Sequence, residues 1–144
     1  MVSALRRAKT KDRSDRAVAI IGASADRSKY GNKAVRAYLS EGYTVWPVNP
    51  REESIEGIRV YHRLDELPGL PHRASIYLRE DAALATLREL ARMEAAAGKR
   101  IGIVYINPGA DTDAVVALAE ELGLKHAETC SIRAIGRTPD EFGE

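Results

Sequence analysis

The turn Gly22-Ala23-Ser24 is the first stretch of the sequence whose residue types could bind a ligand. It follows the apolar run 17–21 and leads into a predicted helix. A glycine permits a tight turn, and free amides at the start of a helix hold phosphate oxygens. Ser24 adds a hydroxyl, and Arg27 and Lys29 add positive charge. The nucleotide-binding pattern G-x-G-x-x-G is incomplete, because Ser24 and Arg27 occupy its second and third glycine positions. We therefore expect an anion-binding loop here, with a plain strand-to-helix turn as the alternative.

A second candidate stretch, Asn49-Pro50-Arg51, follows the apolar run 44–48. Folds that bind NAD place an acidic residue at this point, where it accepts hydrogen bonds from the ribose hydroxyls. An arginine cannot accept such bonds, but it suits a phosphorylated ribose, as in NADP or coenzyme A (CoA). The alternative is that Arg51 is only a solvated loop charge.

The elements that must position these loops follow from the hydrophobic pattern. Short apolar runs predict strands at 17–21, 44–48, 74–78 and 101–106 and from 125 onward. Helical spacing predicts helices at 34–39, 81–97 and 111–122, with one helical turn at 64–67. Strands that alternate with helices imply right-handed crossovers and a parallel sheet. We predict a single Rossmann-like, doubly wound α/β domain with a mainly parallel sheet of five strands or slightly more.

The domain is expected to span residues 17–137. Residues 1–16 hold six Lys or Arg and two Asp, which predicts a basic N-terminal arm or short helix. Residues 138–144 are predicted to be a C-terminal tail.

Composition narrows the class of protein. The 144 residues include 22 Lys or Arg and 21 Asp or Glu, so a net charge of +1 gives no global attraction to nucleic acid or membranes. The single cysteine cannot form an internal disulfide, and no His/Cys cluster has the spacing of a metal site. No apolar run approaches the roughly 20 residues that span a bilayer, and the N-terminus lacks the apolar segment of a secretory signal. We expect a reduced, cytoplasmic protein.

In an open α/β sheet, ligands bind at the carboxyl ends of the strands. Besides the two loops above, this rule selects Tyr77-Leu78-Arg79 after the third strand and Asn107-Pro108-Gly109 after the fourth. It also selects the stretch around Cys130 after the fifth.

No set of residues has the pattern of a catalytic site. If the last strand runs to Cys130, then His126, Glu128 and Cys130 lie on one face, but His126 is roughly 13 Å from the cysteine along a strand. Glu128 would raise rather than lower the pKa of a thiol. Ser24 lacks the glycine that a G-x-S-x-G nucleophile requires two residues later. We expect a binding protein rather than an enzyme; a dehydrogenase would need a substrate-binding region beyond 144 residues.

Four stretches resemble a known family, the small stand-alone CoA-binding proteins, which are similar to the N-terminal CoA-binding domain of the succinyl-CoA synthetase alpha subunit. These stretches are 17–24, 42–50 (GYTVWPVNP, the most specific), 57–68, and 119–124 with Cys130 and Gly136-Arg137. The likeness covers roughly residues 15–137. Two stretches depart from the family pattern: Tyr77-Leu78-Arg79 replaces an aromatic-Arg-Arg run, and 105–109 replaces W-x-Q-x-G.

The resemblance implies this fold and a CoA or acyl-CoA ligand. The loop 22–24 and the helix start would hold the pyrophosphate, residues 48–51 the adenosine and its 3′-phosphate, and the later loops the pantetheine arm. An NADP-type oxidoreductase subunit or a regulatory partner protein is the alternative, and a monomer and a homodimer are both open. The expected ligand-binding residues are Gly22, Ala23, Ser24, Arg27, Lys29, Tyr30, Gly31, Asn32, Val48, Asn49, Pro50, Arg51, Tyr77, Leu78, Arg79, Asn107, Pro108 and Gly109.

Overall fold

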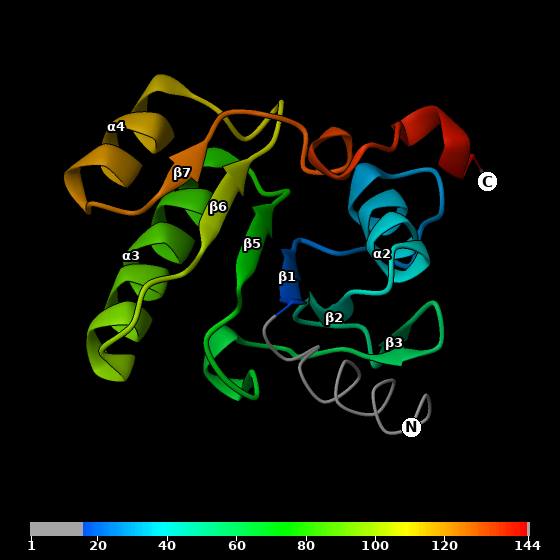
Figure 1. Cartoon of the computed structure of the whole chain (residues 1–144), viewed down its shortest axis with the longest axis horizontal. Coiled ribbons are helices and arrows are strands. Elements are labelled where there is room, and N and C mark those ends of the chain that lie inside the picture. The colour runs from blue at the N-terminus through cyan, green and yellow to red at the C-terminus, as the bar shows by residue number, and fades with distance from the viewer. Residues whose placement is uncertain (1–15, 144) are drawn as a thin grey trace, which may run out of the picture.

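The fold is a parallel sheet of five strands in the order β2-β1-β5-β6-β7 (Figure 1). The computed structural model describes residues 16–143, so nearly all of the predicted N-terminal arm lies outside the described part. The strands are β1 (Ala17–Ile21), β2 (Thr44–Val48), β5 (Arg73–Ile76), β6 (Ile103–Ile106) and β7 (His126–Ala127). All four neighbouring pairs are parallel. The predicted doubly wound α/β class and its five-stranded sheet are confirmed.

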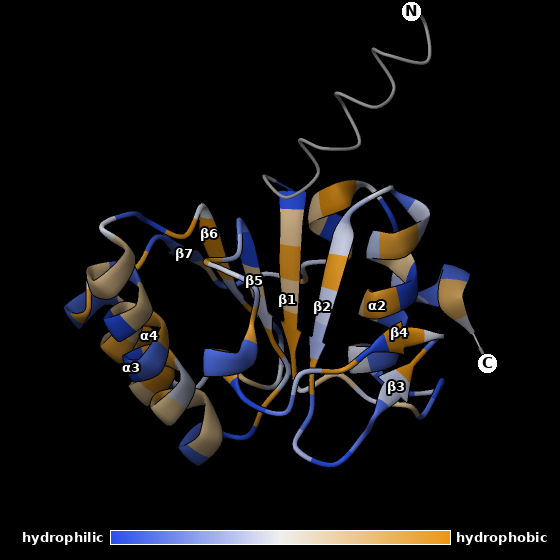
Figure 2. Cartoon of the chain, turned by 90° about the horizontal axis from the view of Figure 1, so that it is seen from below, coloured by the Kyte–Doolittle hydropathy of each residue, from blue (hydrophilic) through white to orange (hydrophobic). Residues whose placement is uncertain are grey.

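Helices cover both faces of this sheet and explain the continuous apolar runs. Val18 and Ile20 of β1 pack toward α2 (Tyr30–Ser40), whereas Ala19 and Ile21 pack toward α3 (Glu80–Ala97) and α4 (Asp113–Glu121). Because both faces are covered, every residue of β1 is buried. Figure 2 shows this central strand as hydrophobic along most of its length.

The helices begin and end close to the predicted positions. Thr112 caps α4, because its side chain accepts a hydrogen bond from the amide of Val115. Gly98 ends α3 in the left-handed conformation, with φ of 64°. The helix α2 begins at Tyr30, earlier than the pattern indicated, which brings its N-terminus next to the end of β1.

Three features of the structure were not predicted. A small hairpin, β3 (Ser54–Ile55) and β4 (Ile58–Arg59), lies between β2 and the 3₁₀ turn η2 (Leu64–Glu66). The strand β7 ends at Ala127 and does not reach Cys130. The condition under which His126, Glu128 and Cys130 would lie on one face of a strand is therefore not met. Beyond the 3₁₀ turn η3 (Arg133–Ile135), the segment expected to be a tail contains the 3₁₀ turn η4 (Pro139–Phe142), whose Phe142 is buried next to α2.

The strand order creates a switch point between β1 and β5. From β1 the chain crosses by α2 to β2 on one side, and β5, β6 and β7 follow on the other side. The loops that leave β1 and β5 therefore diverge, and the crevice between them is where open α/β sheets bind ligands. Within residues 16–143, no helix is long and apolar enough to cross a membrane.

Candidate functional site

A cleft of about 500 Å³ opens at the carboxyl ends of β1, β5 and β6, at the switch point. The loop after β1, the start of α2, and the loops after β5 and β6 form its walls. Most of the expected binding residues from these loops line it: Gly22, Ser24, Lys29, Tyr30, Gly31, Tyr77, Leu78, Arg79, Pro108 and Gly109. The other expected residues, Ala23, Arg27, Asn32, Asn107 and all of 48–51, are not part of its walls.

Two glycines let the backbones of three elements touch beneath the cleft. Gly22 has φ of 92°, and a Cβ atom there would overlap the carbonyl oxygen of Tyr77 at the end of β5. A Cβ atom on Gly31 would overlap the carbonyl oxygen of Gly22. Gly31 therefore allows the close helix–strand packing that the third glycine provides in G-x-G-x-x-G, although it lies outside that spacing.

Some backbone N–H groups at the loop after β1 donate hydrogen bonds within the protein, and others have no acceptor in the described part of the chain. The amides of Gly22 and Ala23 both donate to the carbonyl oxygen of Val48, at 3.2 Å each. They are not available to a ligand, contrary to the role expected for them. The amides of Ser24, Tyr30 and Gly31 have no acceptor among the described residues, and all three residues line the cleft. The amides left free to bind an anion are thus those of Ser24, Tyr30 and Gly31.

Local hydrogen bonds fix the loop between Ser24 and the helix. The amide of Asp26 donates to the Ser24 hydroxyl oxygen at 3.0 Å, which leaves the hydroxyl proton free for a ligand. The Asp26 carboxylate accepts from the amide and the hydroxyl of Ser28, and these two bonds lower the pKa of Asp26.

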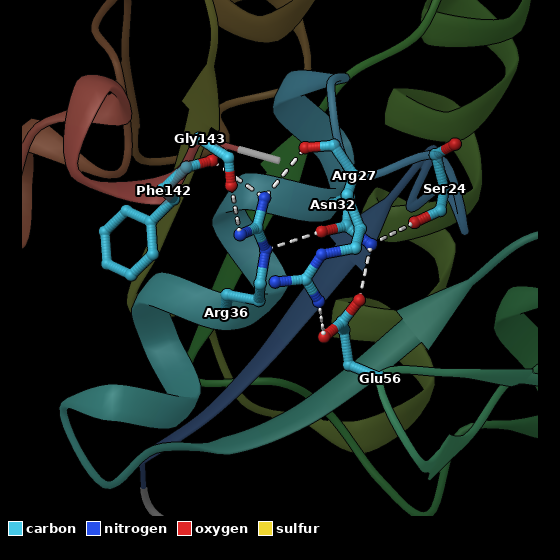
Figure 3. Close-up of polar contacts among 7 residues, drawn as sticks. All are labelled: Ser24, Arg27, Asn32, Arg36, Glu56, Phe142 and Gly143. Carbon is cyan, nitrogen blue, oxygen red and sulfur yellow. Dashed lines mark hydrogen bonds and ion pairs between the residues drawn. The ribbon is translucent and has the colours of Figure 1, made fainter.

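Behind the loop, a network of polar side chains ties it to the β3–β4 hairpin (Figure 3). The Asn32 side-chain amide donates to the Ser24 carbonyl oxygen at 2.9 Å and to the Glu56 carboxylate at 3.1 Å. Arg27 forms an ion pair of 2.6 Å with Glu56. Hydrogen bonding from Asn32, followed by the pairing with Arg27, holds the pKa of Glu56 below its ordinary value. Arg27 and Asn32 were expected to touch a ligand, but here they are held by the protein.

Arg36 extends the network to the C-terminal segment. Its Nε donates to the Asn32 side-chain oxygen at 2.7 Å, and its remaining nitrogens donate to the carbonyl oxygens of Arg27, Phe142 and Gly143 (Figure 3). Burial lowers the pKa of this guanidinium. Arg36 therefore holds both the loop after β1 and the C-terminal segment in place.

The other two expected asparagines also make most of their hydrogen bonds with the protein. Asn49 donates to the Ala23 carbonyl oxygen at 2.9 Å and accepts from the amides of Arg51 and Glu52. Asn107 donates to the Ser75 hydroxyl and to the Ile76 carbonyl oxygen, each at 2.9 Å, and accepts from the amide of Ser131. Each side chain positions a loop, and its contacts with the protein leave only one N–H of Asn49 and one acceptor position on the Asn107 oxygen without a partner among the described residues.

Ser131 is the centre of a buried network that no sequence motif indicated. Its hydroxyl lies 2.7 Å from that of Ser75 and 3.1 Å from that of Tyr77, and its carbonyl oxygen accepts from the Tyr38 hydroxyl at 2.8 Å. Burial raises the pKa of Tyr77 to about 12 and that of Tyr38 still further, so both remain neutral donors. These bonds fix the Tyr77 ring in the wall of the cleft and hold Cys130 nearby.

Four cations at this edge have no acidic or hydrogen-bonding partner within the described part of the chain. Lys29 and Arg79 line the cleft, Arg133 lines an adjoining hollow, and Arg51 is exposed after β2. Arg27, from the same region, is paired with Glu56. Of the four, Lys29 and Arg79 line the cleft itself, where positive charge beside free amides suits an anionic ligand.

The residues weighed for catalysis do not come together. His126 lies 2.8 Å from the carbonyl oxygen of Leu124 through Nδ1, while Cys130 follows the end of β7 and lines the adjoining hollow. Among residues 16–143, no group of three or more His, Cys, Asp or Glu is placed to hold a metal ion.

Comparison with known proteins agrees with this geometry. The model of a family described as a CoA binding domain matches residues 16–135, which is most of the chain. The chain belongs to this family. The resemblance seen in the sequence is thereby confirmed, and CoA binding is supported at the level of the family.

Similar proteins include domains of larger ligases. The alpha subunit of ADP-forming acetate–CoA ligase II from Pyrococcus furiosus is 38% identical over 75 residues, which are 51% of this chain and 16% of that protein. The match therefore spans about a sixth of the length of that relative. A conserved hypothetical protein from P. furiosus has 28% identity and a TM-score of 0.68, covering 83% of this chain and 98% of that one. A dinucleotide-forming acetyl-coenzyme A synthetase 1 from Ca. Korarchaeum cryptofilum shares the fold, with 22% identity, a TM-score of 0.58, and coverage of 79% of this chain and 25% of that one.

Proposed function

We propose that this protein binds CoA or an acyl-CoA in the cleft between β1 and β5 and acts through binding, without catalysing a reaction. One observation carries the proposal: the free amides of Ser24, Tyr30 and Gly31 and two unpaired cations line one cleft. Gly22 and Gly31 allow the loop at its base to pack closely against the end of β5 and the start of α2. This arrangement suits a pyrophosphate, which carries negative charge and several acceptor oxygens.

The ligand's parts follow from the order of the strands. The pyrophosphate would accept from the amides of Ser24, Tyr30 and Gly31, with Lys29 and Arg79 beside it. The adenosine would lie toward β2, against the turn 49–51, whose shape Asn49 fixes through its hydrogen bonds. Arg51 would then face the 3′-phosphate.

The pantetheine arm would leave the pyrophosphate in the opposite direction, toward β6. The side chains of Tyr77 and Leu78 and the turn at Pro108 line that route. These groups are mainly apolar and suit a flexible, uncharged arm.

The test is to identify the ligand and then to remove the cations one at a time. Mass spectrometry of the purified protein should detect retained CoA or acyl-CoA. In calorimetric titrations, Lys29→Gln and Arg79→Gln should each weaken CoA binding about tenfold, because each removes one charge-assisted contact. Arg88→Gln is the matched control, since Arg88 is exposed on α3, outside the cleft.

Three comparisons decide between this proposal and its alternatives. CoA should bind more tightly than dephospho-CoA, and Arg51→Gln should narrow that difference. Tighter binding of NADP than of CoA would favour the oxidoreductase subunit instead. Unchanged CoA affinity in both Lys29→Gln and Arg79→Gln would place the ligand elsewhere.

A further inference from the structure

A second hollow of about 170 Å³ adjoins the cleft on the side of β6 and β7. Tyr30, Tyr77 and Pro108 line both spaces, so the hollow lies directly beside the cleft. The far wall consists of Cys130, Arg133 and Pro139, from the segments that follow β7.

The position of this hollow along the sheet edge fixes which end of CoA could reach it. Arg51 follows β2 at one end of the strand order, and Arg133 follows β7 at the other end. A pyrophosphate between β1 and β5, with its adenosine toward β2, directs the pantetheine arm toward β6 and β7. The hollow thus receives the sulfur end of the ligand.

Arg133 is the unexpected group at that end. Its guanidinium has no hydrogen-bond or ion-pair partner in the part of the chain that the structure covers. The described residues that line the hollow include no Asp or Glu, so its walls supply no counter-charge to Arg133. All the negative charges of CoA lie on its phosphates, at the opposite end of the molecule. Arg133 is exposed, and free CoA would place no negative charge beside its guanidinium.

We propose that the hollow binds the acyl group of a short acyl-CoA that ends in a carboxylate, and that Arg133 pairs with this carboxylate. The inference rests on the proposed CoA site. A volume of 170 Å³ equals that of about five or six water molecules, which fits a few carbon atoms and a carboxylate. The planar guanidinium suits a carboxylate, which it can bind through two parallel hydrogen bonds.

Two stable derivatives of CoA differ only in this charge. Alkylation of its sulfur with iodoacetate gives S-carboxymethyl-CoA, and alkylation with iodoacetamide gives S-carbamoylmethyl-CoA, which has the same shape and no charge. We expect the carboxymethyl derivative to bind about three- to tenfold more tightly in calorimetric titrations. Arg133→Gln should remove this preference and leave the affinity for free CoA unchanged, while Arg88→Gln should leave both unchanged.

The outcomes separate the two proposals. If free CoA does not bind to the wild-type protein, both proposals fail. If CoA binds but the two derivatives have equal affinity, only the carboxylate proposal fails. It also fails if Arg133→Gln weakens free CoA and both derivatives by the same factor, because Arg133 would then serve a phosphate. Arg133→Lys tests geometry: it should keep only part of the preference, because an ammonium lacks the planar fork.

Discussion

Replacing Asn32 by alanine should destabilise the protein and weaken CoA binding, although Asn32 faces away from the cleft. Asn32 is fully buried and makes three hydrogen bonds: one to the Ser24 carbonyl oxygen and two with charged partners, Glu56 and Arg36. A neutral bond contributes about 0.5–1.5 kcal/mol, and a bond to a charged group about 1.5–3 kcal/mol. Glu56 and Arg36 keep other partners and some contact with water, so the lower values apply. After alanine's gain in helix propensity of roughly 0.5 kcal/mol, the net loss is about 3 kcal/mol.

Urea unfolding of the wild type and Asn32→Ala would measure this loss, and a thermal scan should show a decrease in Tm of about 6–12 °C. The isosteric Asn32→Asp isolates the donated bonds. At neutral pH its carboxylate would face both the Ser24 carbonyl and Glu56, so we expect Asn32→Asp to be at least as destabilising as alanine. A loss below about 1 kcal/mol in both variants would refute the idea that this network holds the loop.

Three further predictions concern the loop, its carboxylates and the cysteine. Gly22→Ala should lower the free energy of unfolding by at least about 2 kcal/mol, because a Cβ atom overlaps the Tyr77 carbonyl and φ is 92°. Urea titrations measure this loss. An unchanged free energy of unfolding would contradict the close packing of Gly22 against Tyr77. Hydrogen bonds and ion pairs hold the pKa values of Glu56 and Glu141 below 4.5, so their contribution to stability is present above that pH and lost as pH falls below it. Between pH 7 and 3, the urea midpoint should decrease less for Glu56→Gln than for the wild type. An equal decrease in both proteins would show that protonation of Glu56 does not cause the loss of stability. Cys130→Ser should keep CoA affinity within about threefold in calorimetry, because amides and cations hold the ligand; a larger loss would give the sulfur a role in binding.

The fold was predictable because burial on both sides of the sheet makes strands such as 17–21 wholly apolar. The hairpin was not, because its strands have two residues each, too few for any periodicity to show. Its turn places Glu56 at φ of 52°, where glycine, asparagine or aspartate is the usual residue, so the turn residues gave only a partial signal. The ion pair and hydrogen bond that Glu56 makes with the loop accompany this uncommon conformation.

The place of the candidate site was predictable for a different reason. Ligands of open α/β sheets bind at the carboxyl ends of the strands, and the order of strands and helices was readable from the sequence. The role of each residue was not, because it depends on partners far along the chain. Arg36 contacts Phe142 and Gly143, and Ser75 contacts Ser131. No local pattern shows such pairings.

The partners of the charged groups explain how a nearly neutral chain can attract an anion. A net charge of +1 spread evenly over the surface would give almost no electrostatic attraction for an anion, and the composition alone indicated no such attraction. In the structure, Arg27 is paired with Glu56 and contributes little field at the cleft. Lys29 and Arg79, without such partners among residues 16–143, keep their charge effective there. The same residue type is therefore held by the scaffold at position 27 and left free for an anion at position 79, and the difference lies in whether the fold supplies a carboxylate.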